Sequence, residues 1–89
     1  MTVEEVLRKV KELCEAHGAS EVILYGSRAK GTELERSDID IAVAGAHEFS
    51  ALEEEAEEIP TLYTVDLLDL DACRNELLLE DIRKYGRKI

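Results

Sequence analysis

The sequence predicts an α+β domain, a small mixed β-sheet with helices packed on one side of it. Three segments carry apolar residues at helical spacing, three short runs are rich in β-forming residues, and the two kinds alternate along the 89 residues. The expected order is helix, strand, short helix, strand, helix, strand, helix. A doubly wound α/β sheet would need longer crossovers and more strands, so the α+β class is favoured.

Size and charge limit the function. Residues 1–89 are expected to form a single small domain, because a chain of this length has room for only one core. Such a domain buries about 60–65% of its unfolded surface, so modest stability is expected. The net charge of −10 disfavours direct nucleic-acid binding, because phosphate backbones are held by positive surface. A single nucleotide carried with magnesium remains compatible with this charge.

The cysteines and the N-terminus indicate a cytoplasmic protein. Cys14 and Cys73 have no second Cys or His at ligand spacing, so neither a disulfide nor a zinc site is expected. The acidic, amphipathic N-terminus is unlike a signal peptide. No apolar run approaches the roughly 20 residues needed to span a bilayer, so no membrane association is expected.

In the first half of the chain, Thr2 and Glu5 have capping-box spacing, and the apolar stripe after them predicts a helix over residues 3–16. A β-prone run predicts a strand over residues 21–25, ended by Gly26. A turn or two of helix is expected over residues 28–31, then a polar loop. The second strand is expected over residues 38–44.

In the second half, Ser50 and Glu53 have capping-box spacing and predict a helix that Pro60 stops. The third strand is expected over residues 62–68. Asp71 is expected to cap a last helix that ends at Gly86. The inward residues of this helix are expected to be Cys73, Leu77, Leu78 and Ile82. The last three residues are too short to assign.

The chemistry-bearing residues cluster after the first strand and at the start of the second. Asp38 and Asp40 are two residues apart in a strand, so they point to the same face and repel each other unless a cation lies between them. Gly26 and Ser27 follow a strand and offer backbone N–H groups and a hydroxyl to a phosphate. Together these features predict a metal-dependent site for a nucleoside triphosphate.

A third acid lies in the third strand. Asp66 interrupts an apolar run, and a buried carboxylate is costly unless it is paired or binds a metal. If the third strand lies beside the second, Asp66 joins Asp38 and Asp40, and the three acids could hold two divalent ions about 3.5–4 Å apart. Magnesium is the expected metal. Arg28 and Lys30 are candidates for phosphate contacts.

Simpler interpretations exist for each residue. Asp38 could merely begin a strand, and Asp66 could protect an edge strand from aggregation. Arg28 and Lys30 could be ordinary surface charges. Solvated surface positions are also the simpler expectation for two histidines, His17 and His47.

Taken together, the segments resemble the DNA polymerase β-like nucleotidyltransferase superfamily, and within it the minimal nucleotidyltransferases (MNT). The pattern of that family is Gly-Ser-x-Ala-x-Gly, a loop, Ser-Asp-x-Asp, and a later lone Asp on a strand. Here it is met by residues 26–31, by Ser37, Asp38 and Asp40, and by Asp66. The three parts in this order and spacing are far more specific than any one of them.

The resemblance implies a function. Gly26 and Ser27 would hold the β- and γ-phosphates of ATP, Asp38 and Asp40 would bind two Mg²⁺ ions, and Asp66 would complete the metal site that activates the acceptor hydroxyl. Minimal members are typically encoded beside a helical HEPN toxin and act as its antitoxin, transferring AMP to a tyrosine of the toxin. The resemblance therefore implies a protein adenylyltransferase in a toxin–antitoxin pair, working with a partner or within an oligomer.

Two alternatives remain open. The protein could be a binding module that neutralises its partner by masking its surface, with little or no catalysis, since the chain is small and its surface acidic. It could also modify a small molecule, as the aminoglycoside-modifying relatives do, although such a substrate needs a second domain and residues 1–89 are expected to form only one.

Overall fold

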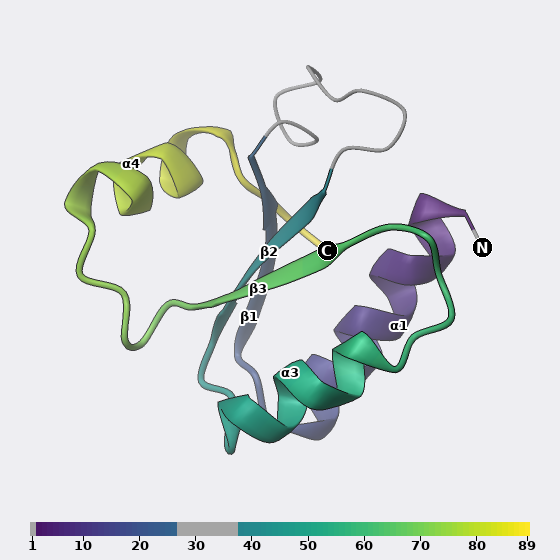
Figure 1. Cartoon of the computed structure of the whole chain (residues 1–89). Coiled ribbons are helices and arrows are strands. Elements are labelled where there is room, and N and C mark those ends of the chain that lie inside the picture. The colour runs from purple at the N-terminus through teal and green to yellow at the C-terminus, as the bar shows by residue number, and fades with distance from the viewer. Residues whose placement is uncertain (1, 27–37) are drawn as a thin grey trace.

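A computed structural model describes residues 2–26 and 38–89, and in these ranges it shows a four-stranded sheet and three helices (Figure 1). In chain order the elements are α1 (Val3–Ala16), β1 (Glu21–Tyr25), β2 (Ile39–Ala44), α3 (Phe49–Glu57), β3 (Val65–Asp69), α4 (Glu76–Tyr85) and β4 (Arg87–Lys88). The short helix expected over residues 28–31 lies outside the described residues.

The sheet is mixed, with strand order β3-β2-β1-β4. β1 pairs antiparallel with both β2 and β4, whereas β2 and β3 are parallel. The parallel pair needs a crossover, and α3 with its flanking segments provides it. The predicted α+β class is therefore confirmed.

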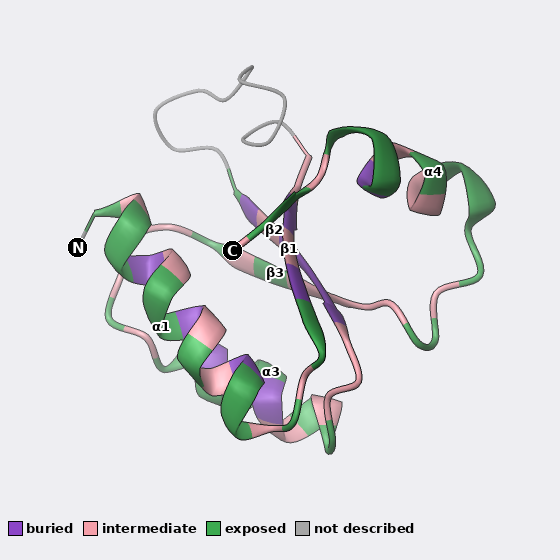
Figure 2. Ribbon diagram, turned by 180° about the vertical axis from the view of Figure 1, so that it is seen from behind, coloured by how far each residue is buried: buried purple, intermediate pink, exposed green. Residues whose placement is uncertain are grey.

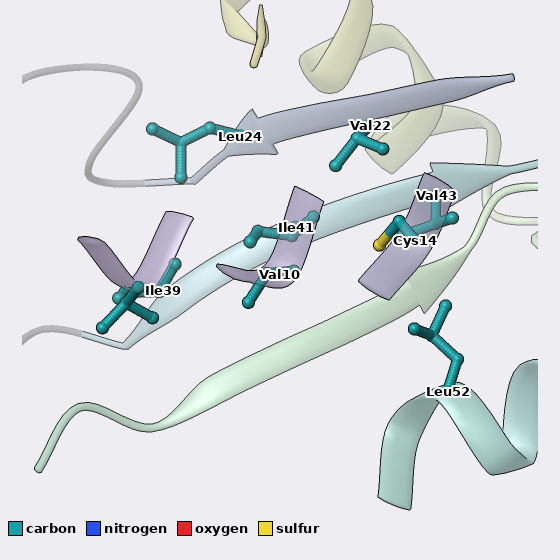
Figure 3. Close-up of a cluster of buried hydrophobic side chains, with 9 residues drawn as sticks. Val10, Cys14, Val22, Leu24, Ile39, Ile41, Val43 and Leu52 are labelled. Atoms are coloured by element: carbon teal, nitrogen blue, oxygen red, sulfur yellow. The ribbon is translucent and has the colours of Figure 1, made fainter. Parts of the chain in front are cut away.

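One face of the sheet forms the core, because alternate strand residues point toward α1 and α3 (Figure 3). The buried cluster consists of Val22 and Leu24 of β1, Ile39, Ile41 and Val43 of β2, Val6, Val10 and Cys14 of α1, and Leu52 of α3. This packing fixes the register of β1 and β2, since a slip of one residue would turn the opposite side chains inward.

The last helix lies on the other side of the sheet from α1 and α3 (Figures 1 and 2), so the expectation that all helices share one side is wrong. Ile82 is the one buried residue of α4. A Cβ on Gly86 would come within 2.7 Å of Ile23, which points away from the core face. Ile82 is inward as predicted, whereas Leu77 is 79% exposed, because five residues along a helix place it on a different face from Ile82. Cys73, which was also expected on this helix, precedes its first residue.

Two of the three helix starts differ from prediction. α1 has the predicted capping box, in which the Thr2 hydroxyl accepts a hydrogen bond from the Glu5 N–H. In α3 the cap residue is Glu48 in a left-handed conformation with φ of 51°, and no side chain caps the helix, so the predicted Ser50 cap is wrong. That helix ends at Glu57, before Pro60 is reached.

In α4 the capping residue is Asn75, whose Oδ1 accepts a hydrogen bond from the Leu78 N–H at 3.2 Å. The predicted cap, Asp71, instead accepts a hydrogen bond from the Gly45 N–H at 2.7 Å and so holds the end of β2. β3 begins three residues later than predicted. β4 was not predicted, because two residues carry no periodic pattern.

The two histidines behave differently. His47 is exposed as predicted. His17 is not a solvated residue, since its side chain is 14% exposed and joins α1 to α3. Its Nδ1 lies 2.8 Å from the His47 carbonyl oxygen, and its Nε2 contacts the Glu55 carboxylate.

None of the helices in the described ranges is long and apolar enough to cross a membrane.

Candidate active site

The three predicted acids lie on one face of the sheet, opposite the core. Asp40 of β2 pairs in register with Asp66 of β3, so the two residues are neighbours across parallel strands that lie about 4.8 Å apart. Asp38 is two residues before Asp40 and shares its face. Asp38 and Asp66 are exposed, and Asp40 is partly buried.

Gly26 lies directly against this acidic group. Its φ of +76° belongs to the left-handed region that favours glycine. A Cβ at this position would come within 2.5 Å of the Asp40 Oδ2 atom. The glycine turn after β1 thus lies against Asp40 of β2, as the predicted site requires.

The acids also act on one another electrostatically. The pKa of the Asp40 carboxyl is raised, first by partial burial and then by the negative charges of Asp66 and Asp38. An ionised Asp40 is therefore held in an unfavourable environment in the protein alone. A cation bound here would relieve that repulsion.

Tyr25 forms the inner side of the site. It pairs in register with Asp40 on the neighbouring strand, so the row across the sheet runs Tyr25, Asp40, Asp66. Its pKa is raised to about 12, mainly by burial and then by the charges of Asp40 and Asp66, so the phenol stays protonated at neutral pH. Tyr25 is a further residue of the site, and the sequence signal for it is its position directly before Gly26.

The donor set suits a divalent cation that prefers oxygen ligands. Carboxylates from neighbouring strands, with their charges in mutual repulsion, are typical ligands of Mg²⁺. Within residues 2–26 and 38–89, however, no three His, Cys, Asp or Glu side chains are grouped closely enough to hold a metal ion between them. The three acids thus share one face of the sheet, and Asp40 is paired with Asp66. In the described part of the chain, their side chains are not close enough together to surround a metal ion.

The remaining predicted site residues lie outside the described residues. They are Ser27, Arg28 and Lys30. Their roles stay predictions based on the sequence.

The mixed sheet carries aspartates on two parallel neighbouring strands beside a glycine turn, an arrangement that suits a domain that transfers nucleotides with a divalent metal. The sequence matches the family described as "Polymerase beta, Nucleotidyltransferase" over residues 8–89, and the protein belongs to that family. No curated protein sequence matches this chain significantly.

Several solved structures share the fold. One is described as "Crystal structure of the toxin-antitoxin with AMP-PNP"; it has a TM-score of 0.71 and 27% identity, over 92% of this chain and 70% of that one. A second is the toxin-antitoxin MntA-HpeT with a tyrosine replaced by alanine, with a TM-score of 0.69, 27% identity, and coverage of 92% and 69%. A third is the same pair with two aspartates replaced by glutamates, with a TM-score of 0.70, 24% identity, and coverage of 92% and 70%.

Proposed function

We propose that this chain is a metal-dependent nucleotidyltransferase that transfers AMP from ATP to a hydroxyl, a tyrosine in the first instance, of a partner HEPN toxin, and that it thereby acts as an antitoxin. The observation that carries the proposal is the register of Asp40 with Asp66 beside Gly26. The family supports nucleotidyl transfer, and the similar toxin–antitoxin structures, one of them with AMP-PNP, support the partner and the nucleotide. We place this function in the cytoplasm and assign it to residues 1–89 as one domain.

In this proposal each acid has its own task. Asp38 and Asp40 hold Mg²⁺, and Asp66 completes the set on the side of the acceptor. Bound magnesium would neutralise the triphosphate and lower the pKa of the attacking hydroxyl. Gly26 and Ser27 hold the β- and γ-phosphates, with Arg28 and Lys30 adding positive charge.

The proposed transfer is a single displacement at the α-phosphorus of ATP. The acceptor oxygen forms a bond to the α-phosphorus of ATP, and the bond from that phosphorus to the bridging oxygen breaks. Pyrophosphate leaves, and the hydroxyl proton passes to the Asp66 carboxylate or to water. The product is an AMP ester of the acceptor.

Two exposed acids are compatible with an acceptor on another chain. Asp38 and Asp66 are exposed, so a side chain on the surface of another protein can reach them. The net charge of −10 suits a basic partner, such as an RNA-binding toxin.

The test is to incubate the purified protein with α-labelled ATP, Mg²⁺ and the HEPN protein encoded beside its gene. We expect label on the partner, and its loss when Asp38→Asn replaces the wild type. Label that persists in the variant, or that never reaches the partner, would overturn the proposal. Binding of AMP-PNP to both proteins, measured by calorimetry, separates lost chemistry from lost nucleotide binding.

A second candidate is neutralisation by masking, favoured by the small size and the acidic surface. The double variant Asp38→Asn, Asp40→Asn distinguishes the two in cells that express the toxin. Full protection by this variant would favour masking. Loss of protection with intact partner binding would favour catalysis.

A further inference from the structure

We propose that the groove between α1 and the end of α3 binds a segment of the partner protein in which Lys or Arg lies beside an apolar residue. This inference rests on the proposed function, which supplies the partner, and it names the surface on which the partner docks. The groove has a volume of about 320 Å³. It belongs to the side of the sheet that α1 and α3 cover (Figure 2), whereas Asp40 and Asp66 face the other side.

The floor of the groove is apolar. Leu13 of α1 and Ile59, which follows α3, line it, and both pack partly buried against the core. Pro60 lines it as well and is exposed. An apolar side chain of another protein can therefore leave water here.

The rim of the groove is negative. It carries Glu12, Glu55 and Glu58, and Lys9 is the one basic residue among the described residues that line the groove. Glu55 already contacts His17. In the described part of the chain, neither Glu12 nor Glu58 forms an ion pair with Lys or Arg. These two carboxylates are thus available to cations of another protein.

The charge pattern of the sequence indicates a basic occupant. Residues 37–73 contain eleven Asp or Glu and no Lys or Arg, so the negative charge of the protein is concentrated there. The exposed acids of this stretch on and directly after α3 are Glu53, Glu54, Glu55, Glu57 and Glu58. Glutamates four residues apart on a helix repel one another. The last turn of α3 carries no basic residue, although the helix dipole favours cations at this end.

This arrangement of charge costs stability within the chain, and a basic partner would offset that cost. Local conflicts of this kind are expected at functional surfaces. RNA does not fit the groove, because its phosphates would be repelled by the same glutamates. A second copy of this chain carries the same net charge of −10 and would also be repelled. A basic protein segment is the occupant that matches.

Docking and chemistry are separable because the groove and the acids lie on opposite faces of the sheet. A change in the groove should therefore alter the affinity for the partner without altering the binding of Mg-AMP-PNP. Glu12, Glu58 and Lys9 are exposed, so substitutions at these positions should keep the fold.

The experiment reverses the charge of the rim. The double variant Glu12→Lys, Glu58→Lys should bind the HEPN protein about tenfold or more weakly, and its affinity should depend less on salt. Lys9→Glu should bind more tightly than the wild type, with a steeper dependence on salt. Calorimetry without ATP measures these affinities, and all variants should bind Mg-AMP-PNP as the wild type does.

The double variant Glu76→Lys, Glu80→Lys is the matched control, because these exposed glutamates line a hollow of about 270 Å³ on α4. It should bind the partner as the wild type does. Wild-type affinity in the groove variant, equal losses in both double variants, or a wild type that does not bind the partner would overturn the inference. So would self-association of the wild type that only the groove variant loses, since a second copy would then occupy the groove.

Transfer of AMP is measured separately, with labelled ATP. A wild type that binds the partner through the groove and transfers no AMP would refute the proposed function and leave the inference standing. Transfer by a wild type whose partner binding ignores the groove would do the reverse.

Discussion

The carboxylate of Asp40 occupies the space that a side chain on Gly26 would need, so the position of Asp40 requires a glycine there. Gly26→Ala therefore forces the carboxylate to move and places alanine in a left-handed conformation, at a cost of about 1–2 kcal/mol. Because a displacement of about 1 Å in a site can cost about 100-fold in rate, we expect a loss of that order in AMP transfer.

Gly45→Ala is the control for this variant. Gly45 also has a positive φ, of +79°, but it lies at the other end of β2, against Ser20. Both variants should unfold at lower urea concentrations than the wild type, and only Gly26→Ala should lose transfer. Equal activity losses would show that the effect is one of general stability rather than of the Asp40 carboxylate.

Asp40→Asn should stabilise the protein in the absence of magnesium. Folding raises the pKa of this carboxyl above its ordinary value, so the folded protein binds the proton more tightly than the unfolded chain does. Stability from this group is therefore lost as the pH rises from the ordinary pKa, near 3.8, through the raised value. Asparagine carries no charge, so its advantage should be absent below that window and full at neutral pH.

Thermal unfolding at pH 3.5 and pH 7 without metal, and again with Mg²⁺, provides the measurement. We expect the midpoint of Asp40→Asn to exceed that of the wild type at pH 7 only. Added Mg²⁺ should raise the wild-type midpoint and leave the variant unchanged. A variant that is less stable at every pH would contradict the interpretation of Asp40 as a strained charge.

The sequence could predict the features that depend on local spacing. Asp38 and Asp40 share a face because strand residues alternate, and α1 carries its capping box within four residues. The prediction that Asp66 joins these acids depends on the third strand lying beside the second, and the parallel pairing of β2 with β3 confirms that condition. Whether these acids bind metal stays a prediction.

The features that depend on distant contacts could not be predicted. β4 is two residues long and exists because it pairs with β1. Asp71 looks like a helix cap in the sequence, but a backbone N–H from Gly45 competes for its carboxylate. The contact of His17 with Glu55 joins residues 38 positions apart. In each case a tertiary partner decided the outcome.

The His17–Glu55 contact should make stability depend on pH. Nδ1 faces a carbonyl oxygen and Nε2 faces a carboxylate, so both ring nitrogens donate and the ring is favoured in its protonated form. The pKa of His17 is accordingly raised, first by the hydrogen bond to Glu55 and then by the one to His47. This stabilisation is full below the ordinary pKa of 6.5 and is lost as the pH rises through the raised value.

Urea unfolding of His17→Gln at pH 5.5 and pH 9 tests this. The variant should be less stable than the wild type at pH 5.5, and the difference should shrink at pH 9. Glu55→Gln should remove most of the pH dependence, and Glu54→Gln on the same helix serves as its control. A His17→Gln deficit that is the same at both pH values would show that the ring acts through packing alone.

Leu52 should be far more important for stability than Leu62. Leu52 of α3 is fully buried against the sheet, whereas Leu62 is 92% exposed. Leu52→Ala should lower the free energy of unfolding by about 2–5 kcal/mol, as expected for a core leucine. Leu62→Ala should change it by no more than about 0.5 kcal/mol. Urea denaturation of both variants measures the difference, and a large deficit in Leu62→Ala would mean that this residue packs in solution.

Asp66 and Asp69 test whether the face of β3 decides function. The two acids are three residues apart on one strand, so they point to opposite faces. Asp66 lies beside Asp40, whereas Asp69 pairs with Val43 and accepts a hydrogen bond from the Asp71 N–H at 3.0 Å. Asp66→Asn should lower AMP transfer by about 100-fold or more, as expected for loss of a group that takes the proton. Asp69→Asn keeps an acceptor oxygen and should change the rate little. Initial rates with labelled ATP, measured at equal amounts of folded protein, compare the two variants. Similar losses of rate in both would mean that the site depends on the total charge of β3 rather than on the position of Asp66.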